Sequence, residues 1–112
     1  MPAPKRSIHS AVTIDGIPLL WHLHREQQGS GEDDDLLGMS IHVKVAEGTR
    51  RELHLEYPLA RPRKTGYVWT PAPRPTIVAP RVQAHIREAM EAGWDPESRG
   101  KPFVYHVSEL PN

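Results

Sequence analysis

Residues 37–45, LGMSIHVKV, decide the fold, because large apolar side chains occupy every second position of this stretch. A period of two predicts a strand with one buried face and one exposed face, as in an antiparallel sheet. Residues 53–57, LHLEY, alternate in the same way, so the two segments are expected to pair as a hairpin. The apolar members of the first segment are Leu37, Met39, Ile41, Val43 and Val45.

The connection between these two strands must have an odd length if both apolar sets are to lie on one face. We predict a three-residue loop with Gly48 or a neighbour in a left-handed conformation. Two registers satisfy this condition, one with His42 opposite His54 and one with His42 opposite Glu56. The sequence leaves the choice between them open.

A second hairpin is predicted near the N-terminus. Residues 8–14 and 17–25 flank the dipeptide Asp15-Gly16, which is a strong hairpin signal because both turn positions take a positive φ. On the second strand one face carries Ile17, Leu19, Trp21 and Leu23, and the other carries Leu20, His22 and His24. Residues 1–7 are expected to be a disordered terminus, and the acidic segment 26–36 a mobile surface loop.

Residues 80–92 are predicted to form a helix, with Pro80 at the first helical position and Ala79, a poor cap, before it. Its apolar stripe consists of Val82, Ile86, Ala89 and Met90, with His85 at the margin. Gly93 is expected to end the helix, and Trp94 to fold back over its last turn.

Residues 93–103, GWDPESRGKPF, form a structural joint in this interpretation. Asp95-Pro96 starts a turn, Gly100 permits a second one, and Phe103, Tyr105 and Val107 alternate in a final strand. A nucleotide-binding loop is excluded, because the glycine spacing is wrong and Pro102 follows the lysine where that motif has a hydroxyl residue.

Together these segments predict an α+β fold: a four-stranded antiparallel meander, one C-terminal helix packed on one face, and a fifth, final strand whose position is left open. We assign residues 8–110 to a single domain, which suits a chain of 112 residues. The chain carries 14 basic and 14 acidic side chains, so its net charge favours neither nucleic acid nor a membrane surface. It has no cysteine, no apolar stretch of membrane-spanning length and no secretory leader pattern, and we expect a cytoplasmic protein.

The proline-rich segment 58–77 is predicted to be a loop that carries a contact surface. Aromatic and arginine side chains are common anchors of protein interfaces, so we predict a non-catalytic binding domain with a protein partner or a homodimer. An alternative is weak binding of single-stranded nucleic acid through phosphate contacts and base stacking. The residues expected to bind are Arg61, Arg63, Tyr67, Trp69 and Arg74.

Histidine is the most unusual component, with seven residues in the chain. Four of them, His22, His24, His42 and His54, fall on outward positions of neighbouring predicted strands. Imidazole nitrogens bind zinc, so a second alternative is a metal-binding protein, with hydrolytic activity if one coordination position holds water. The sequence has no G-x-S-x-G nucleophile elbow. The carboxylates at 32–35 lack the spacing of a calcium-binding loop.

The opening IDG followed by Trp21, and the ending AGW, Pro96 and GKPFV before a last strand, resemble small bacterial proteins of similar length. That family has no assigned activity. The resemblance spans roughly residues 8–108 and implies a self-contained fold, with no site residues to carry over.

Overall fold

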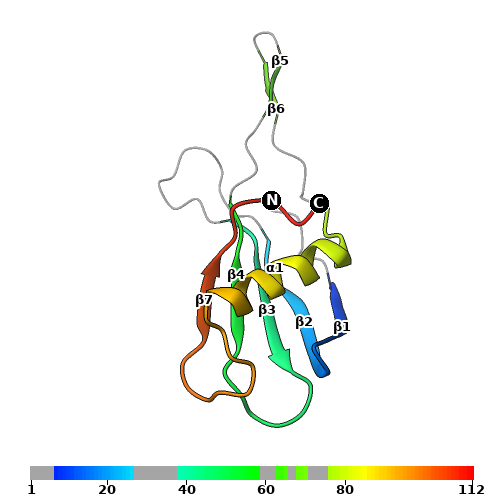
Figure 1. Ribbon diagram of the computed structural model, residues 1–112. Coiled ribbons are helices and arrows are strands. Elements are labelled where there is room, and N and C mark those ends of the chain that lie inside the picture. The colour runs from blue at the N-terminus through cyan, green and yellow to red at the C-terminus, as the bar shows by residue number, and fades with distance from the viewer. Residues whose placement is uncertain (1–6, 27–37, 59–62, 66–67, 71–75) are drawn as a thin grey trace.

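Four consecutive antiparallel strands form the body of the main sheet in the computed structural model of the chain (Figure 1). The structure describes residues 7–26, 38–58, 63–65, 68–70 and 76–112. The four strands are β1 (His9–Ile14), β2 (Ile17–Arg25), β3 (Ser40–Val45) and β4 (Leu53–Glu56). Their spatial order follows their chain order, which confirms the predicted meander.

The fifth strand, β7 (Phe103–His106), extends the sheet beside β4 and pairs with it in parallel. The sheet is therefore mixed rather than wholly antiparallel. A parallel neighbour requires a long crossover, and here the crossover contains helix α1 (Ala79–Ala92). The helix lies across one face of the sheet, as Figure 1 shows, and carries the chain back so that β7 runs in the direction of β4.

The core lies between the sheet and helix α1 and contains the apolar residues that the period-two pattern assigned to one face. From the strands it includes Leu19, Trp21, Leu23, Met39, Ile41, Val43, Leu53 and Leu55, and from the helix Val82, Ile86 and Ala89. Gly38 permits a close approach at the edge of this core, because a Cβ there would collide with the carbonyl oxygen of Tyr57.

The helix begins one residue earlier than predicted. Val78 is the N-cap and makes no side-chain capping bond, so Ala79 is the first helical residue and Pro80 the second. The carbonyl of Val78 accepts from the backbone N–H groups of Arg81 and Val82, and its own N–H donates to Pro111. The C-terminal residues thus fix the helix start, where no polar cap is present.

His85 was predicted at the margin of the helix stripe, but it is fully buried. Its Nδ1 lies 3.1 Å from the Tyr57 hydroxyl, and its Nε2 lies 3.1 Å from Glu109 Oε1. A carboxylate only accepts hydrogen bonds, so Nε2–H donates to Glu109 and Nδ1 accepts from Tyr57. Both ring nitrogens therefore have hydrogen-bond partners, which explains how a polar ring is accommodated at a core position.

The joint after the helix is formed as predicted. Gly93 ends the helix with a positive φ of 126°, and the N–H of Trp94 donates to Ala89. The Trp94 ring is buried in the core, and its Nε1–H donates to the carbonyl of Arg51 at 3.1 Å. Asp95 accepts from the N–H of Glu97 through Oδ1, as expected for a turn residue.

The loop between β3 and β4 is longer than the three residues predicted, since it spans residues 46–52. Its odd length and the positive φ of Gly48, 77°, agree with the prediction. Contacts with the joint account for the extra length: Arg51 donates through Nε to the carbonyl of Lys101, and its N–H donates to Ser98. Local turn chemistry alone could not predict a loop that is shaped by distant residues.

The described residues of the proline-rich segment contribute no strand to the main sheet, but they form two short strands that were not predicted. They are β5 (Arg63–Thr65) and β6 (Val68–Thr70), which pair as a separate two-stranded sheet (Figure 1). The predicted acidic loop falls almost wholly outside the described residues.

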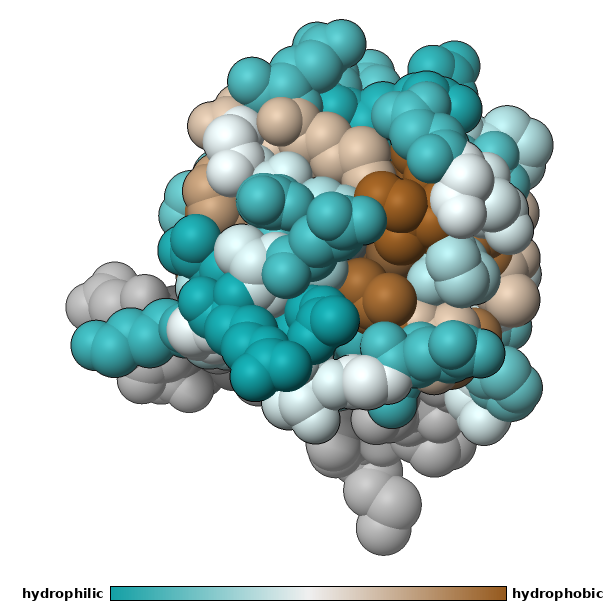
Figure 2. Space-filling view, turned by 60° about the horizontal axis from the view of Figure 1, so that its bottom comes forward, coloured by the Kyte–Doolittle hydropathy of each residue, from teal (hydrophilic) through white to brown (hydrophobic). Residues whose placement is uncertain are grey.

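The surface at the loop end of the sheet is mostly hydrophilic, with one small hydrophobic area (Figure 2). Isolated areas of this kind are ordinary on soluble domains. Within the described residues, no helix is both long enough and apolar enough to span a membrane.

Candidate metal centre

A row of histidines crosses the outer face of the sheet, opposite helix α1. The pairing places His9 opposite His22, His22 opposite His42, and His42 opposite His54, so each of β1 to β4 contributes one histidine to the row. Of the two registers left open by the sequence, the structure has His42 facing His54. The row continues on β7 with Val104 in place of a histidine.

His24 joins the row because of a β-bulge. The register of β2 against β3 shifts between Leu23, which pairs with Ile41, and Arg25, which pairs with Ser40. His24 is therefore the extra residue of β2, with no residue of β3 directly opposite it. Bulges bend the strand and redirect a side chain, and they are over-represented at functional sites. Here the bulge places the His24 ring beside His42 instead of opposite Ser40.

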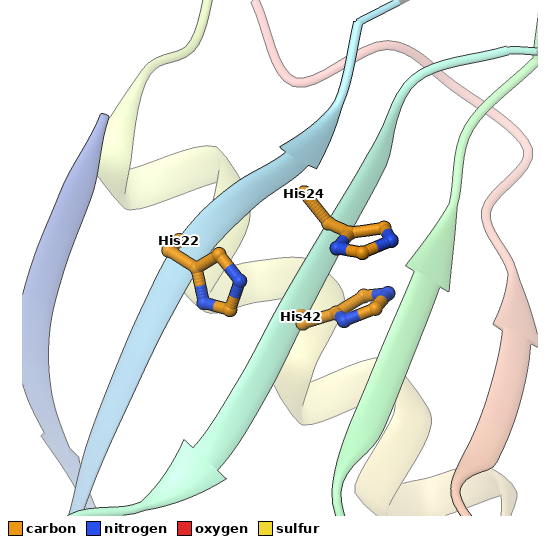
Figure 3. A group of neighbouring side chains, drawn as sticks. All are labelled: His22, His24 and His42. Carbon is orange, nitrogen blue, oxygen red and sulfur yellow. The ribbon is translucent and has the colours of Figure 1, made fainter. Parts of the chain in front are cut away.

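Four rings of the row, those of His22, His24, His42 and His54, lie in contact. The His24 ring stacks on His42 with centroids 3.8 Å apart, and His54 stacks on the other side of His42 at 3.6 Å. His22 meets His42 edge-on at 5.7 Å. Figure 3 shows His22, His24 and His42 gathered on the side of the strands away from the helix.

His42, in the middle of the stack, is held neutral at physiological pH. Burial is the largest cause, and together with the nearby His54, His24, His22 and Arg25 it lowers the pKa of His42 from 6.5 to about 3. Burial also lowers the pKa of His54, although Glu52 and Glu56 oppose this effect. A neutral imidazole has a lone pair free for a metal ion, so this environment removes the proton competition that weakens many histidine ligands.

The glutamates on the same face differ in availability. Glu56 accepts a hydrogen bond from Arg25 Nη2 at 2.7 Å and one from Ser40 Oγ at 3.3 Å. Arg25 also donates through Nε to the carbonyl of Gly38, which fixes the guanidinium at the bulge. Glu52, two residues before His54, instead lies within ligand range of the histidines.

Among the residues that the structure describes, two groups of side chains on this face could hold a metal ion. In the first, His22, His24 and His42 each offer a nitrogen, and the three nitrogens lie within 4.8 Å of one another; in the second, the same holds for His42, Glu52 and His54. Tetrahedral zinc with nitrogens at 2.0–2.1 Å needs ligand atoms about 3.4 Å apart. The ligand atoms must therefore approach one another by up to about 1.4 Å, and stacked rings must turn so that their in-plane lone pairs converge.

The structure brings together the four residues that the sequence proposed as a metal set, His22, His24, His42 and His54, and whether they bind a metal stays a prediction. Sequence reasoning missed Glu52 as a candidate ligand and His9 as the end of the row. Both stand at outward positions by strand alternation, which is the signal that could have found them. His106, outward on β7 and paired with Glu56, was missed in the same way.

The predicted contact surface is only partly described. Arg63 and Trp69 lie on β5 and β6 respectively, whereas Arg61, Tyr67 and Arg74 are outside the described residues. The interface prediction for this segment therefore stays a prediction.

Comparison with known proteins adds no assignment. No protein-family model, no curated protein and no solved structure matches the chain.

Proposed function

We propose that this protein binds a divalent late transition metal ion, with Zn²⁺ as the first candidate, through His22, His24 and His42. The observation that carries the proposal is the bulge at His24, which gathers three imidazole nitrogens from two strands within 4.8 Å. Imidazole nitrogens suit Zn²⁺, Cu²⁺ and Ni²⁺, whereas Mg²⁺ and Ca²⁺ prefer oxygen ligands.

Three protein ligands leave a fourth position of a tetrahedral ion for water or another small ligand. His24 is exposed and the other two rings are half-buried, so this position faces solvent. Zinc-bound water is acidified toward neutral pH, which is the chemical basis of the hydrolytic alternative. Hydrolytic activity is therefore expected only if the histidines bind the metal ion.

Zinc titration by calorimetry on untagged, chelator-treated protein tests the proposal. We expect one Zn²⁺ per chain with micromolar affinity, loss of binding in His42→Ala, and affinity at least about tenfold weaker in His22→Ala, which corresponds to 1.4 kcal/mol. His106→Ala is the matched control, because it removes an outward histidine that belongs to neither group. Absence of heat in the wild type, or equal binding by wild type and His42→Ala, would reject the function.

A second candidate function is the binding of a protein partner or a second copy through the segment 58–77. The pairing of β5 with β6 outside the main sheet supports it, because a lone two-stranded hairpin is marginal in water and gains stability from a surface to pack on. Arg63 and Trp69 on these strands are the residue types that anchor interfaces. Size-exclusion chromatography with light scattering tests the homodimer: a monomer at all concentrations would reject self-association.

A further inference from the structure

We infer that His42, Glu52 and His54 form a second metal site that shares His42 with the first, so that a single ion occupies one site or the other. This inference rests on the proposed metal-binding function. It assigns a second ligand set, two imidazoles and one carboxylate, to the same face of the sheet. It also predicts that the two sites compete and never fill together.

Geometry supports the second set as well as the first. The ligand atoms of His42, Glu52 and His54 lie within 4.8 Å of one another, and all three side chains are half-buried. His42 on β3 lies directly opposite His54 on β4, and Glu52 precedes β4 by one residue, two residues before His54. This site needs no bulge and depends only on strand alternation.

The choice of carboxylate is decided by the neighbours. Glu56 also flanks His54, but Arg25 and Ser40 already bind its two oxygens. Withdrawing Glu56 from that ion pair would leave the Arg25 guanidinium at the bulge without its carboxylate. Glu52 is therefore the carboxylate ligand, and a site of two histidines and one glutamate is an established zinc-binding set.

Competition follows from the chemistry of the shared ring. A neutral imidazole has one nitrogen with a free lone pair and one nitrogen that carries hydrogen. His42 can bind two ions at once only after losing this second proton, to become an imidazolate. It also lies between His24 at 3.8 Å and His54 at 3.6 Å, so turning toward one neighbour moves it away from the other.

The two sites differ in the ions they favour. Three imidazoles suit nitrogen-preferring ions such as Cu²⁺ and Ni²⁺, whereas a carboxylate makes the second set more acceptable to Fe²⁺ and Mn²⁺. Zn²⁺ accepts both sets. A zinc ion displaced from the first site therefore retains a place on the protein, still held by His42.

Zinc calorimetry on four proteins tests the inference: wild type, Glu52→Gln, His22→Ala, and the double variant His22→Ala/Glu52→Gln. We expect one ion per wild-type chain, a change of less than about threefold in Glu52→Gln, weaker but measurable binding in His22→Ala, and a further loss of at least about tenfold in the double variant. His22→Ala/His54→Ala repeats the test with a different ligand removed, and His22→Ala/His106→Ala is the control that should match His22→Ala.

Histidine side-chain NMR identifies the ligands in the same samples. Zinc should shift the ring signals of His22, His24 and His42 in the wild type, and those of His42 and His54 in His22→Ala. Two ions per wild-type chain would overturn the competition, and equal affinities of His22→Ala and both double variants would overturn the second site. Either result leaves the first site intact, whereas absence of zinc binding by the wild type rejects the proposed function and the inference with it.

Discussion

Replacement of Tyr57 by Phe tests the buried network that links β4, helix α1 and the C-terminal segment. The substitution retains the aromatic ring, whose centroid lies 5.4 Å from that of His85, and removes only the hydroxyl. Tyr57 is 4% exposed and His85 is 0% exposed, so no water replaces the lost donor at the buried Nδ1. An acceptor left without a partner in such a place costs about 1–3 kcal/mol. We expect the free energy of unfolding at pH 7 to fall by about 2 kcal/mol.

The same hydroxyl makes stability depend on alkaline pH. Burial raises the pKa of Tyr57, and the carboxylates of Glu88 and Glu109 raise it further. Above pH 10 a tyrosine in the unfolded chain loses its proton while Tyr57 in the folded protein keeps it. The unfolded state then binds fewer protons, so stability falls as pH rises, by about 1.4 kcal/mol in total between pH 7 and pH 11 and by about 1.4 kcal/mol for each pH unit beyond. The Tyr57→Phe variant lacks this fall in stability, because it has no hydroxyl at this position.

Urea unfolding of both proteins at pH 7 and pH 11 measures the two effects. The midpoint of the variant should lie about 1 M lower at pH 7, and the difference in unfolding free energy should shrink to under about 1 kcal/mol at pH 11. Tyr105→Phe, which removes a hydroxyl from a half-buried tyrosine on β7, is the matched control for the loss of a tyrosine hydroxyl outside the buried network. Equal midpoints of wild type and Tyr57→Phe at pH 7, or a difference that stays constant from pH 7 to pH 11, would refute the reasoning.

Three further predictions concern the close approach at Gly38, the joint and the histidine row. Gly38→Ala forces a Cβ against the Tyr57 carbonyl and should destabilise the protein by about 3 kcal/mol, measured by thermal unfolding; an unchanged melting temperature would contradict the close approach. Trp94→Phe removes the bond to the Arg51 carbonyl and part of the buried ring, and should cost about 2 kcal/mol in urea unfolding. In metal-free protein the pKa of His42 is lowered to about 3. Below pH 6.5 the unfolded chain therefore takes up a proton at this residue that the folded chain does not. Stability should therefore fall by about 1–2 kcal/mol from pH 7 to 4.5, after allowance for solvent screening of this half-exposed ring, and His42→Gln should lose this dependence.

Strand alternation predicted most of the fold because a half-buried sheet imposes a strict period of two. The side chains assigned to the inner face, from Ile17 to Leu23 and from Met39 to Val45, are on that face. Alternation carries no information about strand direction, so the parallel pairing of β7 was left open. It also could not fix the register of His42, since His54 and Glu56 both preserve the inner face.

The features missed depend on contacts between residues far apart in the sequence. His85 can be buried because Glu109 and Tyr57 satisfy its nitrogens. Both partners lie outside the helix, so the helical periodicity of the sequence gives no information about them. The bulge at His24 has no local signature, such as a glycine, in HLHR. The four histidines were predicted to share a face, but their gathering around His42 follows from that bulge.

The histidine row has two arrangements that exclude each other. In the metal-free row, His42 stacks on both neighbours, and each aromatic pair contributes about 0.5–1.5 kcal/mol. Coordination requires at least one of these stacks to open, because the lone pairs of parallel rings do not converge. The metal affinity is lowered by that cost, by about tenfold for each 1.4 kcal/mol. Under the proposed function, the row is therefore expected to bind a metal ion reversibly and less tightly than a preformed site would, and the ring that must give up its stacking is His42.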